Sequence, residues 1–462
     1  MRKTVKIFFL AFCTLFVVRN LCAQRAKTKQ PNIIFILTDD MGYSDLGIYG
    51  NPVIRTPFLD SLARAGLMAT NYVVSSPSCT PSRASLLTGR YASRYNLPDP
   101  IGPGSPLGLP DAEITLPEIL KKAGYRTAMI GKWHLGDKHE WNYPTAQGFD
   151  TYYGMLYSHD YRYPYVKTDT TIKIFRNRTP EIWKPEDSLL TRLYTREAMS
   201  LIGQQTGDKP FFLYLAYNMP HLPVAFAAQA SYLKNKQQGG PLGAVVEDLD
   251  SNIALIVGKL KAEKLLDNTI IAFSSDNGPW IEYPTRMEGD GMTKRWHAGS
   301  AGIFRGSKGQ SYEGGVREPF ILYWKDHIRA GTILASPISN LDIVPTLAYW
   351  ANAKIPAGDT LDGENIHALL TGKTAAQQYV HRPIYIVNHG KPEAVRLGDW
   401  KYLKIPAGMN PSSGKPQDAV EALFNLNEDP SERVNLVDAL PEKAAEMKSL
   451  FTDYPDPKNN KD

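Results

Sequence analysis

Cysteine is scarce in this sequence of 462 residues. It contains only Cys13, Cys22 and Cys79, and the first two lie in an N-terminal stretch that looks like a signal peptide. The mature chain would then hold one cysteine, which excludes an internal disulfide. Export without disulfides is unusual on an animal secretory route, so we expect a bacterial exported protein. A single cysteine left in such a chain indicates a thiol with a function of its own.

A strong charge of one sign is also missing. The 52 basic and 47 acidic residues leave a formal net charge of +5, and no Lys/Arg cluster forms. We therefore predict no nucleic-acid partner, while a mildly basic site for an anionic substrate is compatible with this balance. With 43% hydrophobic residues, a chain of this length can bury one large core and a smaller unit.

No segment is long and apolar enough for a stable membrane span. Residues 7–18 are apolar and follow a basic start, but they are too short to cross a bilayer. Leu21-Cys22-Ala23 resembles a cleavage site, so we expect residues 1–23 to be a signal peptide and the protein to be secreted, into a bacterial periplasm. A surface lipoprotein anchored at Cys22 is the alternative, but Arg19-Asn20 is a poor context for lipidation.

Apolar runs alternate with helical segments from residue 31 to about 370. Residues 33–37, 127–130, 211–215 and 269–273 are near-continuous apolar runs, typical of strands buried on both faces of a mostly parallel sheet. Helices are predicted from Thr56 as a cap to Gly66, over residues 117–123 and over residues 244–265. This alternation predicts an α/β fold, with a large mostly parallel or mixed sheet between helices, in a catalytic domain of residues 24–375.

The pattern changes after residue 375. Residues 383–387, 394–397 and 400–403 are predicted short strands, the last two joined by a turn at Gly398-Asp399. Residues 404–420 have the composition of a loop, and residues 441–451 are predicted to form a closing helix. We expect residues 376–462 to form a smaller antiparallel α+β subdomain.

Polar residues follow each of the four predicted strands of the large sheet. Open α/β sheets bind ligands beyond the carboxyl ends of their strands, so these groups converge if the strands are parallel neighbours. In strand order they are Asp39 and Asp40, then Lys132 and His134, then His221, and finally Asp276 and Asn277.

Two of these groups offer only oxygen ligands. Asp39-Asp40 and Asp276-Asn277 favour a hard cation, calcium or magnesium, over zinc, and several carboxylates favour calcium. Either pair alone is more typical of a turn or cap. Lys132 and His134 would face one side of an extended segment, where they could bind an anion and move a proton.

Cys79 is predicted at the start of a helix. Pro81 and Ser82 suit a first helical turn, and Gly89 suits the end. Cys79 would then lie at the positive end of the helix, where anions are favoured. A buried structural cysteine is the alternative, but Arg83 one turn further on argues against it.

These residues form motifs that resemble a known family. Cys79-Thr80-Pro81-Ser82-Arg83 with the following Leu-Leu-Thr-Gly-Arg run is similar to the maturation and active-site motif of type I sulfatases, in the alkaline phosphatase superfamily. Nearly the whole chain from residue 31 shares the resemblance, through residues 32–40, 131–136, 276–278, 306–309, 312–319 and 425–435.

The resemblance implies a sulfate ester hydrolase with an alkaline phosphatase-like fold. A separate maturation enzyme would oxidise Cys79 to formylglycine, whose hydrate attacks sulfur beside one calcium ion. Arg83 would hold the hydrate, and His134 would take a proton from it when sulfate leaves. Lys132, His221 and Lys308 would contact the sulfate, with Lys308 or His221 protonating the leaving alcohol. The implied metal ligands are Asp39, Asp40, Cys79, Asp276 and Asn277.

A further segment resembles one in arylsulfatase A-like members of the family. Tyr157-Ser158-His159-Asp160 would place Ser158 in the site, with His159 and Asp160 as candidates for binding sugar hydroxyls. A surface loop with satisfied polar side chains is an equal alternative for the last two. His389, in the C-terminal unit, could also reach the substrate.

The resulting hypothesis is an exo-acting carbohydrate sulfatase whose substrate is a sulfated glycan of the galactose or N-acetylgalactosamine type. A phosphate or phosphonate ester hydrolase of the same superfamily would keep the same cation site. A non-enzymatic surface protein that binds sulfated glycans is a second alternative. The presence of Cys79, Arg83, Lys132, His134 and Lys308 together argues against it.

Overall fold

The four apolar runs form neighbouring strands of one sheet, as predicted. They are β1 (Asn32–Thr38), β3 (Arg126–Gly131), β7 (Phe211–Ala216) and β8 (Thr269–Ser275). Their order is β8-β1-β7-β3, and every pairing among them is parallel. Because both faces are covered, their side chains are apolar without alternation. The carboxyl ends of the four strands therefore meet at one edge.

Further strands extend this sheet on both sides into a mixed sheet. Its order is β10-β2-β9-β8-β1-β7-β3-β4-β5-β6, with β11 also paired to β2. β9 runs antiparallel to both β8 and β2, while β4 is parallel to β3. The bounds of these strands are β2 (Leu67–Val73), β4 (Thr151–Gly154), β5 (Lys173–Arg176), β6 (Thr179–Trp183), β9 (Arg317–Tyr323), β10 (Thr332–Leu334) and β11 (Ile338–Ser339).

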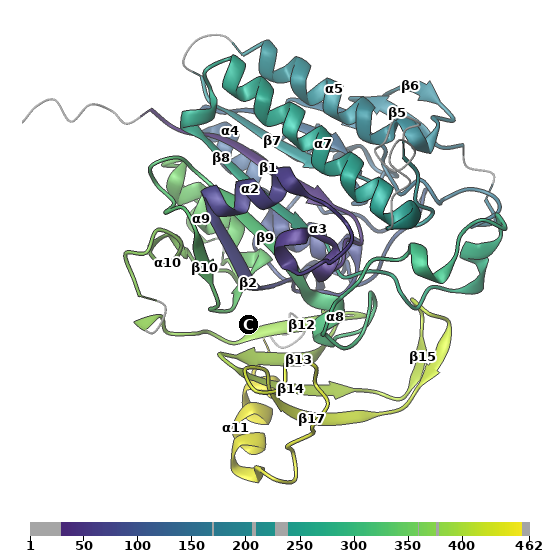
Figure 1. Ribbon diagram of the computed structural model, residues 1–462, viewed down its shortest axis with the longest axis vertical. Coiled ribbons are helices and arrows are strands. Elements are labelled where there is room, and N and C mark those ends of the chain that lie inside the picture. Colours follow the sequence, from purple (N-terminus) through teal and green to yellow (C-terminus); the bar gives the residue numbers. More distant parts are fainter. Residues whose placement is uncertain are drawn as a thin grey trace, which may run out of the picture. The chain divides into compact units, whose positions relative to one another are not determined.

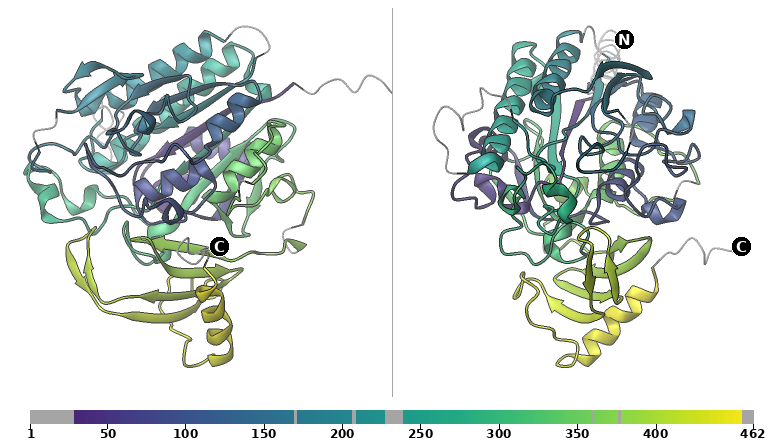
Figure 2. Two further views of the ribbon diagram at one scale, coloured as in Figure 1. Left: turned by 180° about the vertical axis from the view of Figure 1, so that it is seen from behind. Right: turned by 90° about the vertical axis from the view of Figure 1, so that its right-hand side faces the viewer.

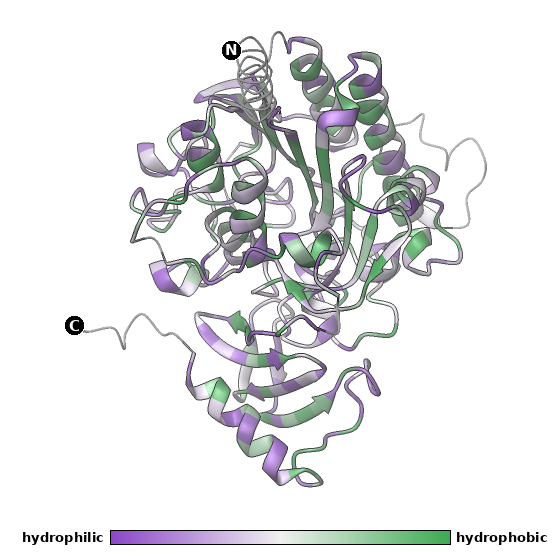
Figure 3. Cartoon of the chain, turned by 90° about the vertical axis from the view of Figure 1, so that its left-hand side faces the viewer, coloured by the Kyte–Doolittle hydropathy of each residue, from purple (hydrophilic) through white to green (hydrophobic). Residues whose placement is uncertain are grey.

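Helices cover both faces of the large sheet (Figures 1 and 2). One apolar cluster joins Ile34 and Ile36 of β1 to α2 (Pro57–Ala65), α5 (Leu190–Gly203) and α7 (Gly240–Ala262). The opposite cluster joins Ile33 and Phe35 to α3 (Cys79–Thr88), α4 (Leu116–Lys122) and α9 (Ile343–Trp350). Figure 3 shows the central strands as the most hydrophobic part of the chain. Two short helices are α8 (Glu313–Val316) and α10 (His367–Leu370).

A second, antiparallel sheet follows, as predicted. Its order is β12-β13-β14-β17, with bounds β12 (Ile384–Asn388), β13 (Lys391–Leu397), β14 (Trp400–Ile405) and β17 (Val420–Asn425). Leu397 pairs with Trp400, which confirms the turn at Gly398-Asp399. The closing helix α11 (Pro441–Thr452) packs on β13 and β14.

This computed structural model describes residues 29–168, 171–205, 209–226, 239–358, 360–375 and 378–454. The predicted signal peptide, residues 1–23, lies outside them. Residues Pro31–Asp462 form one compact unit, so the domain boundary expected after residue 375 stays a prediction. Among the described residues, no helix has the length and apolar character needed to cross a membrane.

Three local predictions were wrong. Residues 404–420 are not all loop, because β15 (Gly408–Asn410) and β16 (Lys415–Gln417) pair as a hairpin around Gly414, whose φ is 68°. α7 starts at Gly240, four residues before the predicted start at residue 244. Thr56 makes no cap hydrogen bond, because its hydroxyl oxygen accepts from the backbone N–H of Gly47 and the first N–H groups of the helix donate to Asp250.

Candidate active site

Cys79 is the first residue of α3, directly at the positive end of the helix. The helix ends at Gly89, whose φ of 69° is a left-handed conformation that favours glycine. Every residue of α3 is buried, and Cys79 is 2% exposed. Burial raises the pKa of the Cys79 thiol, although Lys308 and Lys132 partly oppose the rise. The predicted helix and the predicted position of Cys79 on it are both present.

The predicted acidic residues meet at Cys79. Asp39, Cys79 and Asp276 each offer one ligand atom, and these three atoms lie within 4.8 Å of one another. Asp40 donates its backbone N–H to Asp276 Oδ1 over 3.1 Å, and Asn277 Nδ2 donates to Asp40 Oδ1 over 2.7 Å. The side-chain oxygen Asn277 Oδ1 is buried and has no hydrogen-bond partner among the described residues. An oxygen-rich set with a free buried oxygen fits a hard cation such as calcium.

Arg83 lies between two of these carboxylates. Its Nε donates to Asp276 Oδ2 over 2.8 Å, and its Nη2 lies 3.2 Å from Asp39 Oδ1. Its Nη1 also donates to the backbone oxygen of Lys132 over 3.1 Å. All of these side chains are fully buried, so the guanidinium fixes both carboxylates in place.

Two lysines approach the same acidic cluster. Lys132 Nζ donates to Asp39 Oδ2 over 2.6 Å, and Lys308 Nζ lies 2.8 Å from Asp40 Oδ1. Burial favours a raised pKa for Asp39, but Lys132, His221 and Arg83 together hold the pKa of Asp39 well below its usual range. For Asp40, burial outweighs Lys308 and leaves the pKa raised. The ammonium groups of Lys132 and Lys308 therefore lie beside the carboxylates, where they can bind an anion.

His134 is held in one tautomer. The ring nitrogen Nε2 lies 2.8 Å from the backbone oxygen of Ile101, so Nε2 must donate. Its Nδ1 is buried, has no hydrogen-bond partner in the part of the chain that the structure describes, and is left as an acceptor. Burial, reinforced by Lys132, lowers the pKa of His134. The extended conformation predicted here is wrong, because φ is 106° at Gly131 and 63° at His134.

His221 and Ser158 lie on the other side of Asp40. His221 Nε2 is 3.5 Å from Asp40 Oδ2, and its Nδ1 donates to the backbone oxygen of Leu222 over 2.6 Å. Ser158 Oγ lies 3.4 Å from that same Nδ1. Burial, with Lys308 next, lowers the pKa of His221. The structure thus places both residues beside the acidic cluster, and their roles stay predictions.

His159 and Asp160 are buried behind His221. His159 Nε2 donates to the backbone oxygen of Pro223 over 2.9 Å, and its ring centre lies 5.7 Å from that of His221. Asp160 Oδ2 lies 3.7 Å from Arg286, while Oδ1 has no hydrogen-bond partner. Their predicted contact with sugar hydroxyls stays a prediction.

Three residues of the site had no role in the sequence argument. Trp280 places its ring 4.5 Å from Lys308 Nζ. Thr80 donates to the backbone oxygen of His134 over 2.9 Å, and Tyr161 donates to the backbone oxygen of Ile101 over 3.1 Å. Thr80 lies inside the cysteine motif and could have been inferred from it, whereas nothing in the sequence indicates Tyr161.

Comparison with known proteins settles the family. The profile of the Sulfatase family matches residues 31–353. The chain belongs to the sulfatase family. This sulfatase is similar to human arylsulfatase A, with 36% identity over 93% of this chain and 89% of that protein. It is similar to human N-acetylgalactosamine-6-sulfatase, with 34% identity over 80% of this chain and 71% of that protein.

A solved structure shares the architecture. The protein Ps i-CgsB, in complex with k-i-k-neocarrahexaose, superposes with a TM-score of 0.77 at 29% identity, covering 92% of each chain. The protein is therefore an enzyme that hydrolyses sulfuric esters, with an α/β fold of a large mixed sheet and a small antiparallel sheet. Its family implies formylglycine and a divalent metal, and the position of Cys79 beside Asp39 and Asp276 fits both.

Proposed function

We propose that this sulfatase removes the sulfate group from a sulfated sugar after Cys79 is converted to formylglycine by a separate maturation enzyme. One observation carries the proposal: Cys79 begins a buried helix, with ligand atoms of Asp39 and Asp276 close to its own. We propose Ca²⁺ as the cation, held by Asp39, Asp40, Asp276, Asn277 and the modified residue 79.

The converted side chain of residue 79 would supply the nucleophile. Its hydrated aldehyde, next to a divalent cation, would offer one hydroxyl to attack sulfur and a second whose proton can be removed later. The protein positions this centre. Arg83 holds Asp39 and Asp276 in fixed places, and the buried surroundings exclude bulk water. Electrostatic stabilisation by such preorganised groups is usually the largest contribution to catalysis.

Three side chains bind the sulfate oxygens and the leaving group. Lys132 and Lys308 bring two ammonium groups to the acidic cluster, and they would turn to the anion when it arrives. His221 lies beside them at Asp40. As negative charge develops on the oxygen of the departing alcohol, Lys308 or His221 donates the proton that releases it.

His134 returns the site to its starting state. Its Nδ1 is the free acceptor, since Nε2 donates to the Ile101 oxygen. It would therefore accept the proton of the second hydroxyl on converted residue 79, so that the aldehyde re-forms, the Cβ–O bond to the sulfate group breaks and free sulfate departs. A plain serine at position 79 lacks the second hydroxyl and would be left sulfated.

The sugar part of the proposal rests on relatives and on burial. One relative is named for N-acetylgalactosamine, and a solved neighbour is in complex with k-i-k-neocarrahexaose. Cys79 and Lys308 are 2% and 6% exposed, so the site suits a terminal sulfated residue and exo action. We propose a galactose or N-acetylgalactosamine sulfate, encountered in a bacterial periplasm if residues 1–23 direct export.

The test is sulfate release from a panel of sulfated galactose and N-acetylgalactosamine isomers. The protein is produced together with a maturation enzyme, and conversion at residue 79 is verified by peptide mass. Release by the wild type, with none from Cys79→Ala, is expected. Release from phosphate or phosphonate esters but from no sulfate ester would contradict the proposal.

A further inference from the structure

Asp99 and His389 form an ion pair between segments far apart in the sequence. The nitrogen His389 Nδ1 lies 2.5 Å from Asp99 Oδ1. The two side chains are 35% and 49% exposed, whereas the catalytic side chains are almost completely buried. The pair thus presents an imidazole and a carboxylate to the solvent side.

Asp99 and His389 each lie within two residues of a residue that contacts the catalytic segments. Asp99 is two residues before Ile101, whose backbone oxygen accepts from His134 and from Tyr161. His389 follows Asn388, whose Nδ2 donates over 3.2 Å to the backbone oxygen of Gly309, the residue after Lys308. The pair therefore lies at the edge of the site, between the segment that orients His134 and the loop that carries Lys308.

The backbone at His389 adopts a left-handed conformation in a tight turn. His389 and Gly390, with φ of 50° and 73°, form the two-residue turn between β12 and β13. Such turns favour Asn-Gly, and a histidine in the left-handed region carries a cost that is typical of functional positions. A Cβ atom on Gly390 would lie 3.0 Å from Pro98 Cβ, so the turn packs tightly against the Asp99 segment.

The ion pair has little to contribute to folding. Exposed pairs typically add about 0–1 kcal/mol, because water screens the charges and two side chains are ordered. Its chemistry suits a different purpose. Because His389 Nδ1 donates to one oxygen of Asp99, the second carboxylate oxygen can accept a hydrogen bond from a hydroxyl group. His389 Nε2 can form a hydrogen bond with a neighbouring hydroxyl group.

We propose that Asp99 and His389 together bind two hydroxyl groups of the sugar ring that carries the sulfate, and so determine which sugar is accepted. The inference rests on the proposed function, because it identifies the polyhydroxylated part of the same substrate. Discrimination follows from geometry: a sugar whose hydroxyl points the other way leaves the carboxylate unpaired, which disfavours binding.

The test compares two kinds of substrate. One is the sulfated sugar with the highest turnover in the panel, and the other is 4-methylumbelliferyl sulfate, which has no ring hydroxyls. The variants are Asp99→Asn and His389→Asn, the latter chosen because asparagine suits the left-handed turn position. Lys325→Ala, which removes an exposed ion pair with Asp267 elsewhere, is the matched control.

For each variant, kcat/KM on the sugar should fall roughly 10- to 100-fold, as expected when a hydrogen bond to a charged group is lost. The loss on the aryl sulfate should be at least about tenfold smaller, and the control should lose neither activity. Equal losses on both substrates, or no loss on the sugar, would overturn the inference. A wild type active on the aryl sulfate alone would also overturn it, whereas a wild type inactive on both would remove the proposed function itself.

Discussion

At the scale of single residues, the site depends on one buried arginine between two carboxylates. Arg83→Met should lower the free energy of unfolding by about 3–5 kcal/mol, because Asp39 and Asp276 lose their compensating charge in a buried place. Urea denaturation in the presence of a chelator measures the effect. Arg178→Met, which removes an exposed arginine paired with Glu140, is the control and should change stability little. Equal stability of both variants would contradict the predicted role.

The substitution Asn277→Ala tests the cation site without changing its charge. Calcium added to chelated wild type should stabilise the fold by about 2–3 kcal/mol at a concentration about 100 times its Kd. Asn277→Ala removes the buried oxygen that has no hydrogen-bond partner, so at least half of this gain should disappear. Thermal unfolding with and without calcium gives the comparison, with the exposed Asn427→Ala as control. A full calcium response in Asn277→Ala would exclude Asn277 as a ligand.

The acidic residues at strand ends could be predicted from the strand pattern, and Lys308 and Ser158, outside strands and helices, came only from motif resemblance. The contact between Asp99 and His389 could not be predicted by either route. Asp39 and Asp276 follow strands whose apolar runs identify them, and parallel pairing then brings them together. Asp99 and His389 are separated by 290 positions, and their contact depends on how two irregular segments pack. No periodicity or spacing in the sequence indicates such a contact.

At the scale of elements, α2 receives its cap from another helix. Asp250 of α7 accepts the backbone N–H groups of Phe58 and Leu59 over 3.1 and 2.7 Å. This explains why Thr56 does not cap the helix itself. Asp250→Ala should destabilise the protein by about 1–2 kcal/mol, the usual cost of losing a helix cap. A loss below about 0.3 kcal/mol in urea denaturation would show that the cap is dispensable.

The same carboxylate makes stability depend on pH. Burial raises the pKa of Asp250 to about 6, above its unfolded value of about 4. The folded state then binds the proton more tightly, so the contribution of this group is fully present below about pH 4 and is lost as pH rises to about 6. Wild type should therefore lose stability relative to Asp250→Asn across that window. A difference that does not vary with pH would contradict the raised pKa.

Long buried apolar elements were predictable, and a short exposed hairpin was not. The runs in β1, β3, β7 and β8 mark buried strands whatever surrounds them. The hairpin of β15 and β16 consists of two three-residue strands that are mostly exposed, and tertiary contacts decide its position. Trp280 Nε1, for example, donates to the backbone oxygen of Ser412 over 2.9 Å.

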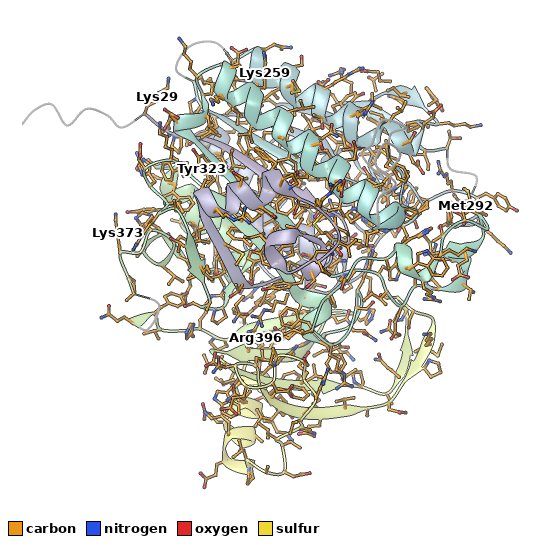
Figure 4. The ribbon with its side chains drawn as sticks, in the orientation of Figure 1. Lys29, Lys259, Met292, Tyr323, Lys373 and Arg396 are labelled. Carbon is orange, nitrogen blue, oxygen red and sulfur yellow. The ribbon has the colours of Figure 1, made fainter. Side chains whose placement is uncertain are left out.

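At the scale of the whole molecule, a buried ionic network joins the C-terminal sheet to helix α8. Lys401 Nζ of β14 lies 3.1 Å from Glu313 in α8 and 2.7 Å from Glu432. Arg396 of β13, labelled in Figure 4, lies 3.1 Å from the second oxygen of Glu313. Burial favours a raised pKa for Glu313, but Arg396 and Lys401 lower it to about 2. Since α8 begins five residues after Lys308, the network ties the C-terminal sheet to the catalytic loop.

Lys401→Met should lower the free energy of unfolding by about 3–5 kcal/mol, because two buried glutamates lose a shared cation. Lys404→Met, in the same strand but exposed, provides the matched control and should change stability by less than about 0.5 kcal/mol. Unfolding curves of the two variants give the answer. If both variants are as stable as the wild type, the network does not stabilise the fold.

The central claim is that residue 79, once converted, is the nucleophile of a sulfate ester hydrolase. The most direct measurement compares preparations with different fractions of formylglycine at position 79, each fraction determined by peptide mass. The rate of sulfate release from one sulfated sugar should rise in proportion to that fraction and reach zero where cysteine alone is present. Sulfate release that does not depend on the fraction, or that persists in fully unconverted protein, would contradict the account.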